Sequence, residues 1–95
     1  MHYYSLNNRS VTIDFKQATI EGQAPDRGLY FPSDIPIWSK AFCENLSQRS
    51  NVEIAFEIML PYIGTSIPEK ELMRILEDTL SFDFPLRQIN EQIYA

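Results

Sequence analysis

The side chains most often used in catalysis are few in this sequence. It contains one histidine, His2, and one cysteine, Cys43, and a cysteine nucleophile needs a base such as histidine within hydrogen-bond reach. His2 lies beside the N-terminus, where chains commonly fray, so we expect it to be exposed and Cys43 to be a small core residue of a short helix. A zinc site needs three or four ligands at suitable spacing, and no such spacing occurs. We therefore predict no catalytic residue and no metal ligand.

The glycines and carboxylates are equally poorly placed for chemistry. Phosphate-binding loops need closely spaced glycines, whereas the three glycines here are scattered: Gly22, Gly28 and Gly64. Several carboxylates fall at helix starts or on polar helix faces, where a solvated surface explains them: Glu69, Glu71, Glu77 and Asp78. The sequence predicts neither a nucleotide-binding loop nor a catalytic carboxylate pair.

Length and charge narrow the class of protein. The 95 residues, 44% hydrophobic and 22% charged, predict one domain over residues 1–95. The net charge of -5 argues against nucleic acid or an anionic membrane as main partner, because both favour clustered Lys and Arg. No apolar run is long enough to span a bilayer, and the first residues do not form a signal peptide. A single cysteine fits a reducing compartment, so we expect a cytoplasmic location.

The elements of the first half are short. Tyr3–Ser5 and residues 11–13 have the pattern of strands. Asp14 is a helix N-cap with Gln17 at the capping-box position, so a helix should run to about residue 21 and end at Gly22. The turn over residues 24–28 places a glycine where a positive φ is allowed, and residues 29–31 follow as a strand that Pro32 ends.

The second half is mainly helical. Trp38, Ala41, Phe42 and Leu46 recur at helical spacing and predict a short helix within residues 33–49. Two Ser-x-x-Glu capping boxes, at Ser50 and Ser66, each precede an amphipathic helix. The first carries an apolar stripe that we expect to pack on the second: Val52, Ala55, Phe56 and Met59. The second presents Leu72, Ile75, Leu76, Thr79 and Leu80. Pro61 should kink or end the first of these helices.

After Phe82 and Phe84, residues 86–89 and 92–95 read as a hairpin around Asn90-Glu91. The predicted fold class is therefore α+β: a small, mostly helical domain with short strands at the N-terminus, after the Pro-Asp-x-Gly turn and at the C-terminus. Since the chain stops inside an extended apolar segment, we expect it to be a fragment of a longer protein.

Five stretches, in order, resemble the N-terminal domain of the threonine synthase family. They are Tyr3-Tyr4-Ser5 with Asn7, the Asp14-Phe15 helix start, the stretch from Ala24 to Pro32, the stretch from Glu53 through Tyr62-Ile63-Gly64 to Ile67-Pro68, and the stretch from Phe82 to Tyr94. The most distinctive is Pro-Asp-x-Gly-Leu-Tyr-x-Pro. The sequence departs from the family pattern at Arg27, where the family usually has Gly, and at Leu6, where it usually has Thr. If residue 27 keeps a positive φ, Arg27 carries about 1 to 2 kcal/mol of strain.

This resemblance implies a parent enzyme of threonine biosynthesis, a lyase that converts O-phosphohomoserine and water to threonine and phosphate. Its pyridoxal phosphate would be held by a lysine that follows a His-Gly-Pro-Thr stretch, and both would lie beyond Ala95. The three lysines present have helix-surface contexts without a phosphate cradle: Lys16, Lys40 and Lys70. The resemblance thus implies a non-catalytic segment with no cofactor of its own, whose partners are the cofactor-binding domains of the parent chain.

The residues also allow a second interpretation, a stand-alone acidic helical protein-interaction module that shares only capping and turn chemistry with that family. A continuation into His-Gly-Pro-Thr would separate the two. If domains that normally cover apolar surface near Tyr3, Tyr30 and Tyr94 are missing, the chain should also self-associate.

Overall fold

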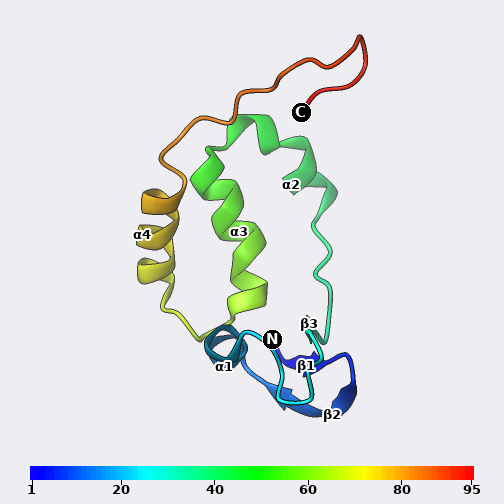
Figure 1. Ribbon diagram of the computed structural model, residues 1–95. Helices are drawn as coiled ribbons and strands as arrows, with labels where there is room; N and C mark the ends of the chain where they lie inside the picture. The colour runs from blue at the N-terminus through cyan, green and yellow to red at the C-terminus, as the bar shows by residue number, and fades with distance from the viewer.

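The structure is a computed structural model that describes all of residues 1–95. Its elements are β1 (Tyr3–Ser5), β2 (Asn8–Ile13), α1 (Phe15–Glu21), β3 (Tyr30–Pro32), α2 (Lys40–Glu44), the short 3-10 helix η1 (Leu46–Gln48), α3 (Asn51–Ile63) and α4 (Glu69–Thr79). The sheet and α1 lie at one end, α3 and α4 run side by side from it, and the segment after β3 leads away to α2 (Figure 1). The α+β class predicted from the sequence is confirmed.

The sheet is antiparallel with strand order β2-β1-β3. Strands were predicted at residues 3–5, 11–13 and 29–31; β2 begins earlier, at Asn8, and β3 is shifted by one residue. Tyr3 joins the sheet to the helices, because its ring packs 6.1 Å from that of Phe15 and its hydroxyl donates a hydrogen bond to the Tyr62 carbonyl in α3. Tyr3 is therefore buried within this chain, and the expectation that missing domains cover it is wrong.

Helix α1 begins and ends as predicted. Oδ1 of Asp14 accepts a hydrogen bond from the backbone N–H of Gln17 at 2.8 Å, and Gly22 closes the helix at φ 71°. The predicted capping box is wrong, because the Gln17 side chain donates to Glu21 at 2.7 Å instead. Residues four apart share a helix face, so the Gln17 side chain extends toward Glu21 and not back to the N-cap residue.

Helix α2 is shorter than the predicted span. Ser39 caps it by accepting from the N–H of Phe42 at 3.1 Å, which leaves Trp38 before the helix, and Leu46 belongs to η1. Only Phe42 of this helix is buried. Cys43 is exposed, so its predicted place in the core is wrong: a five-residue helix that buries only Phe42 leaves the next residue in solvent.

The capping box at Ser50 is confirmed, with reciprocal hydrogen bonds between Ser50 and Glu53. Pro61 does not end α3, which continues to Ile63 and closes at Gly64. A proline in the last turn removes only one backbone hydrogen bond, and packing of the apolar face maintains the helix. The capping box at Ser66 is wrong: α4 starts after Pro68 without a side-chain cap, since the Ser66 N–H already bonds to the Ile63 carbonyl at 3.3 Å.

The core lies between α3 and α4. Its buried centre is formed by Ile63, Leu72 and Leu76, and partly buried neighbours from α1, α3 and α4 surround it: Phe15, Val52, Ala55, Phe56, Leu60, Ile67 and Leu80. The predicted facing of Val52, Ala55 and Phe56 toward α4 is confirmed. Met59 and Ile75 were also placed in the core, but both are more than a third exposed because each lies at the edge of the contact.

The predicted C-terminal hairpin is present, but its two arms pair through only a few backbone hydrogen bonds. Arg87 and Ala95 exchange backbone hydrogen bonds of 2.7 and 2.8 Å, and Gln88 opposes Tyr94 in a single bridge. The Asn90 side chain accepts from two N–H groups of the turn. All of residues 81–95 are exposed, so this hairpin has no apolar support from the rest of the chain.

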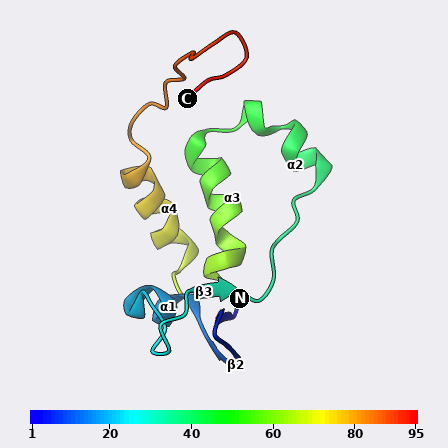
Figure 2. The ribbon, with the colours of Figure 1, turned by 45° about the vertical axis from the view of Figure 1, so that its right-hand side comes forward.

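The overall shape is open. The radius of gyration is 16.5 Å, whereas a compact domain of 95 residues has about 12 Å. The accessible surface is 7519 Å², about a third more than the roughly 5,700 Å² expected for a folded monomer of this mass. Figure 2 shows the same opening from another side, between α3 and the segment that leads to α2. These values indicate a chain that leaves apolar surface uncovered.

The turn between α1 and β3 differs from the predicted one. The positive φ falls on Arg27, at 70°, and not on Gly28. Glycine is needed at position 28 because the backbone there approaches the Ser5 side chain closely. A Cβ on residue 28 would lie 2.0 Å from the Ser5 Oγ. Arg27 therefore carries the strain expected for an L-residue in the left-handed region, about 1 to 2 kcal/mol.

Replacing Arg27 by Gly should raise stability. The relief of strain exceeds the extra backbone entropy that glycine brings to the unfolded chain, about 0.5 to 1 kcal/mol, so we expect a net gain of roughly 0.5 to 1 kcal/mol. Urea unfolding of Arg27→Gly measures it. Arg87→Gly, at a position without positive φ, is the matched control and should not stabilise; a lower midpoint for Arg27→Gly would contradict the strain.

Candidate functional site

A network of polar groups lies where the turn of residues 24–28 meets β1. Oδ1 of Asp26 accepts a hydrogen bond of 2.6 Å from the Ser5 hydroxyl and one of 2.9 Å from the Gly28 N–H. Asn7 adds two bonds, from its side-chain amide to the Asp26 carbonyl and from its backbone N–H to Ser5. Ser5 is almost fully buried. The network thus ties the turn to the central strand.

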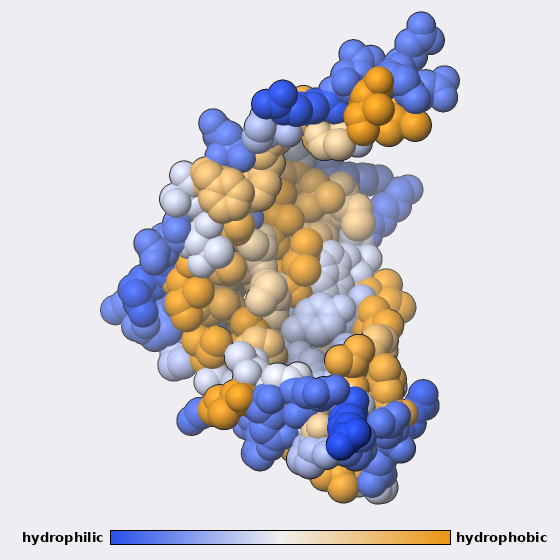
Figure 3. All heavy atoms as spheres, in the orientation of Figure 1, coloured by the Kyte–Doolittle hydropathy of each residue, from blue (hydrophilic) through white to orange (hydrophobic).

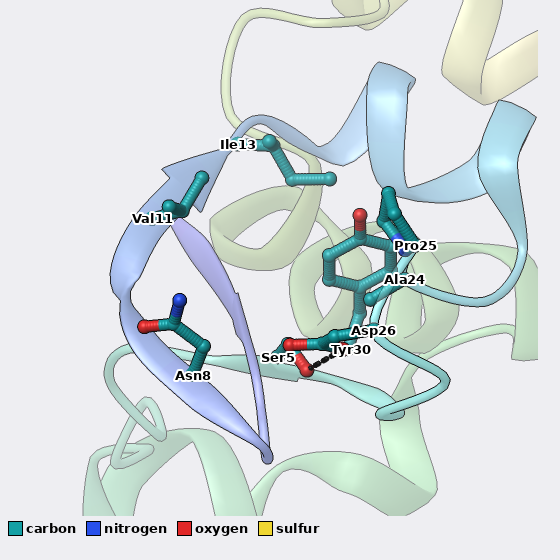
Figure 4. Close-up of a pocket in the computed structure, with 8 residues that line it drawn as sticks. All are labelled: Ser5, Asn8, Val11, Ile13, Ala24, Pro25, Asp26 and Tyr30. Atoms are coloured by element: carbon teal, nitrogen blue, oxygen red, sulfur yellow. Dashed lines mark hydrogen bonds between the residues drawn. The ribbon is translucent and has the colours of Figure 1, made fainter.

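A hollow of about 210 Å³ lies beside this network. Figure 4 shows Val11 and Ile13 on β2 on one side of it, and Ala24, Pro25 and the ring of Tyr30 on the other, with the Ser5–Asp26 hydrogen bond at its base. Its walls are mainly apolar, and Asp26 supplies the one charged group that lines it.

The chemistry available in this hollow is limited. Hydrogen bonds from Ser5 and Gly28 lower the pKa of Asp26, so its carboxylate is a weaker base than an ordinary aspartate. A general base works best with a pKa near the operating pH, and no histidine lines the hollow. Ser5 donates to a weak base and already accepts from Asn7. The arrangement holds the turn in shape.

Tyr30, at the rim of the hollow, is paired with α1. Its hydroxyl donates a short hydrogen bond to Glu21, which raises the pKa of Tyr30 to about 12. The same bond, with that from Gln17, lowers the pKa of Glu21. The pair fixes β3 against α1.

The hydrogen bonds to Asp26 should make the stability of the fold depend on pH in the acid range. Because the folded-state pKa of Asp26 lies below that of an ordinary aspartate, its stabilisation is fully present above the ordinary aspartate pKa and is lost as the pH falls through the folded-state pKa. We expect the wild-type melting temperature to fall more steeply below pH 4 than that of Asp26→Asn, which does not titrate. Thermal melts from pH 6 to pH 2 test this. Asp34→Asn is the control and should keep the wild-type slope; parallel curves for Asp26→Asn and wild type would contradict it.

The structure does not bring the candidate catalytic and metal-binding residues of the sequence together in one site. His2 lies by the sheet and Cys43 in α2, at opposite ends of the opening (Figure 1), so the structure does not form a dyad. No three His, Cys, Asp or Glu side chains lie close enough to share a metal ion. The carboxylates expected on the surface of α4 are exposed, and one of them, Glu71, pairs with Arg74 at 3.0 Å.

The lysines do not fit a Schiff-base site. All three are exposed: Lys16, Lys40 and Lys70. Lys40 pairs with Glu44 across one helix turn. Lys16 borders a shallow depression together with Asp14 and Glu21, whose carboxylates would repel a phosphate. The residues present therefore do not fit pyridoxal phosphate, and no step of a reaction is assigned to them.

The Ser5–Asp26–Asn7 network was not predicted from the sequence. Its signal was available, because Pro-Asp-x-Gly is typical of a turn in which an aspartate bonds the N–H two residues later. The participation of Ser5, 21 residues away, has no local signal. None of the helices is long and apolar enough to cross a membrane.

The fold and the network together define a class of protein: a small α+β segment whose polar groups stabilise its own turn and whose helices leave an apolar side open. Comparison with known families identifies the segment. Residues 2–80 match the family described as threonine synthase N terminus, and the chain belongs to that family.

Individual proteins of known sequence and structure support the same family assignment. The chain is 36% identical over 80 residues to the threonine synthase of Schizosaccharomyces pombe, covering 83% of this chain and 16% of that protein. It is 30% identical over 95 residues to that of Pseudomonas aeruginosa, covering 95% and 20%. The crystal structure of threonine synthase from Escherichia coli has the same fold, with a TM-score of 0.88 and 24% identity over 99% of this chain and 22% of that one. The chain thus spans about a fifth of the length of these relatives.

The family match decides between the two interpretations of the sequence. The chain belongs to the family of threonine synthase N-terminal segments, and nothing in the comparisons supports a stand-alone acidic interaction module. The two departures at Arg27 and Leu6 do not disturb the fold: Arg27 adopts the glycine-like φ, and Leu6 is half exposed in the turn between β1 and β2.

Proposed function

We propose that the protein to which this segment belongs converts O-phosphohomoserine and water to threonine and phosphate. The observation that carries this proposal is the match of residues 2–80 to the threonine synthase N terminus, together with similarity to threonine synthases over nearly the whole chain. Residues 1–95 would form one domain of that enzyme, in the cytoplasm, without catalytic or cofactor-binding residues of their own. Pyridoxal phosphate would be bound by a lysine outside these residues.

The role proposed for the segment is structural. Its open shape and its exposed helices suit a domain that is completed by the cofactor-binding domains of the same chain. The acidic balance of the chain disfavours nucleic acid or an anionic membrane as a partner.

A domain exchange tests this proposal. We expect an E. coli threonine synthase whose N-terminal segment is replaced by residues 1–95 to restore growth of a threonine-requiring strain without added threonine. The control carries Leu72→Asp in the exchanged segment, which places a charge in the buried core. A soluble exchange enzyme that binds the cofactor but forms no threonine would contradict the proposal.

The absence of a cofactor lysine is tested separately. After incubation with pyridoxal phosphate and reduction with borohydride, we expect the 95-residue chain to carry only low and distributed labelling of its lysines, because none has a site that fits the cofactor. Mass spectrometry of peptides reads this out. Stoichiometric labelling of a single lysine would contradict the assignment.

The isolated chain should self-associate. Its exposed apolar side chains exceed what monomers usually present, so the weight-average mass in sedimentation should rise with concentration, despite the net charge of -5. Added salt screens that charge and should strengthen the association. A single monomeric species at every concentration and salt level would contradict this expectation.

A further inference from the structure

Helix α3 is apolar on two opposite sides. One side packs on α4 through Val52, Phe56 and their neighbours. The other carries Ile54, Ile58 and Pro61, at positions i, i+4 and i+7 of a helix, which form a single stripe. Ile58 is 38% exposed. An apolar stripe on a helix normally packs against other protein, yet Ile54, Ile58 and Pro61 are not among the residues that pack on the core between α3 and α4.

The second side of α3 borders a groove. Glu57, Leu60 and Pro61 of α3 line it on one side, and Phe42 of α2 with residues 36–39 before that helix complete the lining. The groove has a volume of about 360 Å³. Ile37 is 95% exposed, so this side chain touches almost nothing in the chain itself. We call Ile37, Trp38, Ile54, Ile58 and Pro61 together the open face.

Figure 3 agrees with an apolar open side. In that view the hydrophobic atoms gather in a hollow over α3, between α4 and the segment that leads to α2, whereas the outer edge along α4 is hydrophilic. That edge carries charged side chains such as Glu71 and Arg74. The ion pair of Arg49 and Glu57, 2.9 Å apart, lies at the rim of the groove. An apolar centre with a charged rim is the usual anatomy of a protein interface.

The size of the uncovered area is sufficient for a permanent contact. The accessible surface of 7519 Å² exceeds the roughly 5,700 Å² of a compact monomer by about 1,800 Å². Part of this excess belongs to the exposed residues 81–95, and a standard interface buries about 800 Å² on each partner. The open arrangement also recurs over 99% of this chain in the E. coli enzyme, where this part is 22% of the chain. Since this part is 22% of the E. coli chain, the remaining part of that chain is large enough to cover the open side.

We propose that the open face is the surface on which the remainder of the threonine synthase chain docks, through an apolar segment that inserts between Ile37 and the stripe of α3. This inference rests on the proposed function and deepens it by naming the docking surface. The occupant is part of the same polypeptide, and the contact is apolar at its centre, with Arg49 and Glu57 at its edge.

The test compares the exchange enzyme described above with the isolated chain. Ile37→Glu and Ile58→Glu place a charge on the open face. Ile20→Glu is the matched control, because Ile20 is 74% exposed on α1 and does not belong to the open face. Melting temperature and the yield of soluble enzyme are measured for each variant in both contexts.

In the exchange enzyme, we expect Ile37→Glu and Ile58→Glu to lower the melting temperature by about 5 °C or more, and Ile20→Glu to leave it unchanged. In the isolated chain, Ile37→Glu and Ile20→Glu should have equally small effects, since both side chains are free there. The larger loss in the exchange enzyme than in the isolated chain identifies the face as covered by the rest of the enzyme.

The two proposals fail in different ways. An unsubstituted exchange enzyme that makes no threonine counts against the proposed function. An active exchange enzyme in which all three variants behave alike overturns the docking surface and leaves the function standing. If Ile37→Glu abolishes a dimer of the isolated chain but does not affect the exchange enzyme, the face binds a second copy and the proposal is wrong.

Discussion

Replacing Leu72 by Ala should lower the free energy of unfolding by about 3 to 5 kcal/mol. Leu72 is 2% exposed and is the most deeply buried large side chain of the chain. It lies with Ile63 and Leu76 at the centre of the contact between α3 and α4. Removing three of its carbon atoms loses their transfer free energy and leaves a cavity that two helices cannot fully close.

This loss is a large fraction of the free energy of unfolding of the whole domain. Small domains are stable by about 5 to 15 kcal/mol, and a chain with only 8 buried residues out of 95 belongs at the low end. We therefore expect Leu72→Ala to remove the cooperative thermal transition seen by circular dichroism. Ile75→Ala, one turn away at the exposed edge of the same helix, should cost less than about 1.5 kcal/mol. If Leu72→Ala and Ile75→Ala lowered the free energy of unfolding equally, the assignment of the Leu72 side of α4 to the core would be contradicted.

Replacing Gly28 by Ala should cost about 2 to 4 kcal/mol. Its Cβ would lie 2.0 Å from the Ser5 Oγ and 3.0 Å from Oδ1 of Asp26. Ser5 is buried in the central strand and cannot move away, so the hydrogen bond between Ser5 and Asp26 has to break. The cost combines overpacking with a buried hydroxyl that has lost its acceptor.

Gly22→Ala is the matched control, because Gly22 has a positive φ of 71° but no atom within 4 Å of its added Cβ. It should cost only the strain of the left-handed region, about 1 to 2 kcal/mol. Urea unfolding of both variants compares them directly. A second variant, Gly28→Ala with Ser5→Gly, removes the clash and should recover part of the loss; no recovery would mean that the close approach is not what makes Gly28 necessary.

Local patterns in the sequence were sufficient to predict most of the elements. Asp14 and Ser50 cap the helices that follow them, because a cap depends on atoms within three residues. The spacing of Leu72 and Leu76 indicated which side of α4 is buried. The Pro-Asp-x-Gly stretch indicated both the turn and the family, which the match of residues 2–80 confirms.

Contacts between distant residues could not be predicted in this way. The need for glycine at position 28 depends on Ser5, which lies more than twenty residues away and occupies the space beside Gly28. The extension of α3 past Pro61 depends on its packing against α4. Exposure of Cys43, Met59 and Ile75 depends on where two helix surfaces stop touching. A sequence pattern indicates which side of a helix is apolar, but only the tertiary structure decides which apolar side is covered within the chain and which, like the open face on α3, is left for another part of the protein.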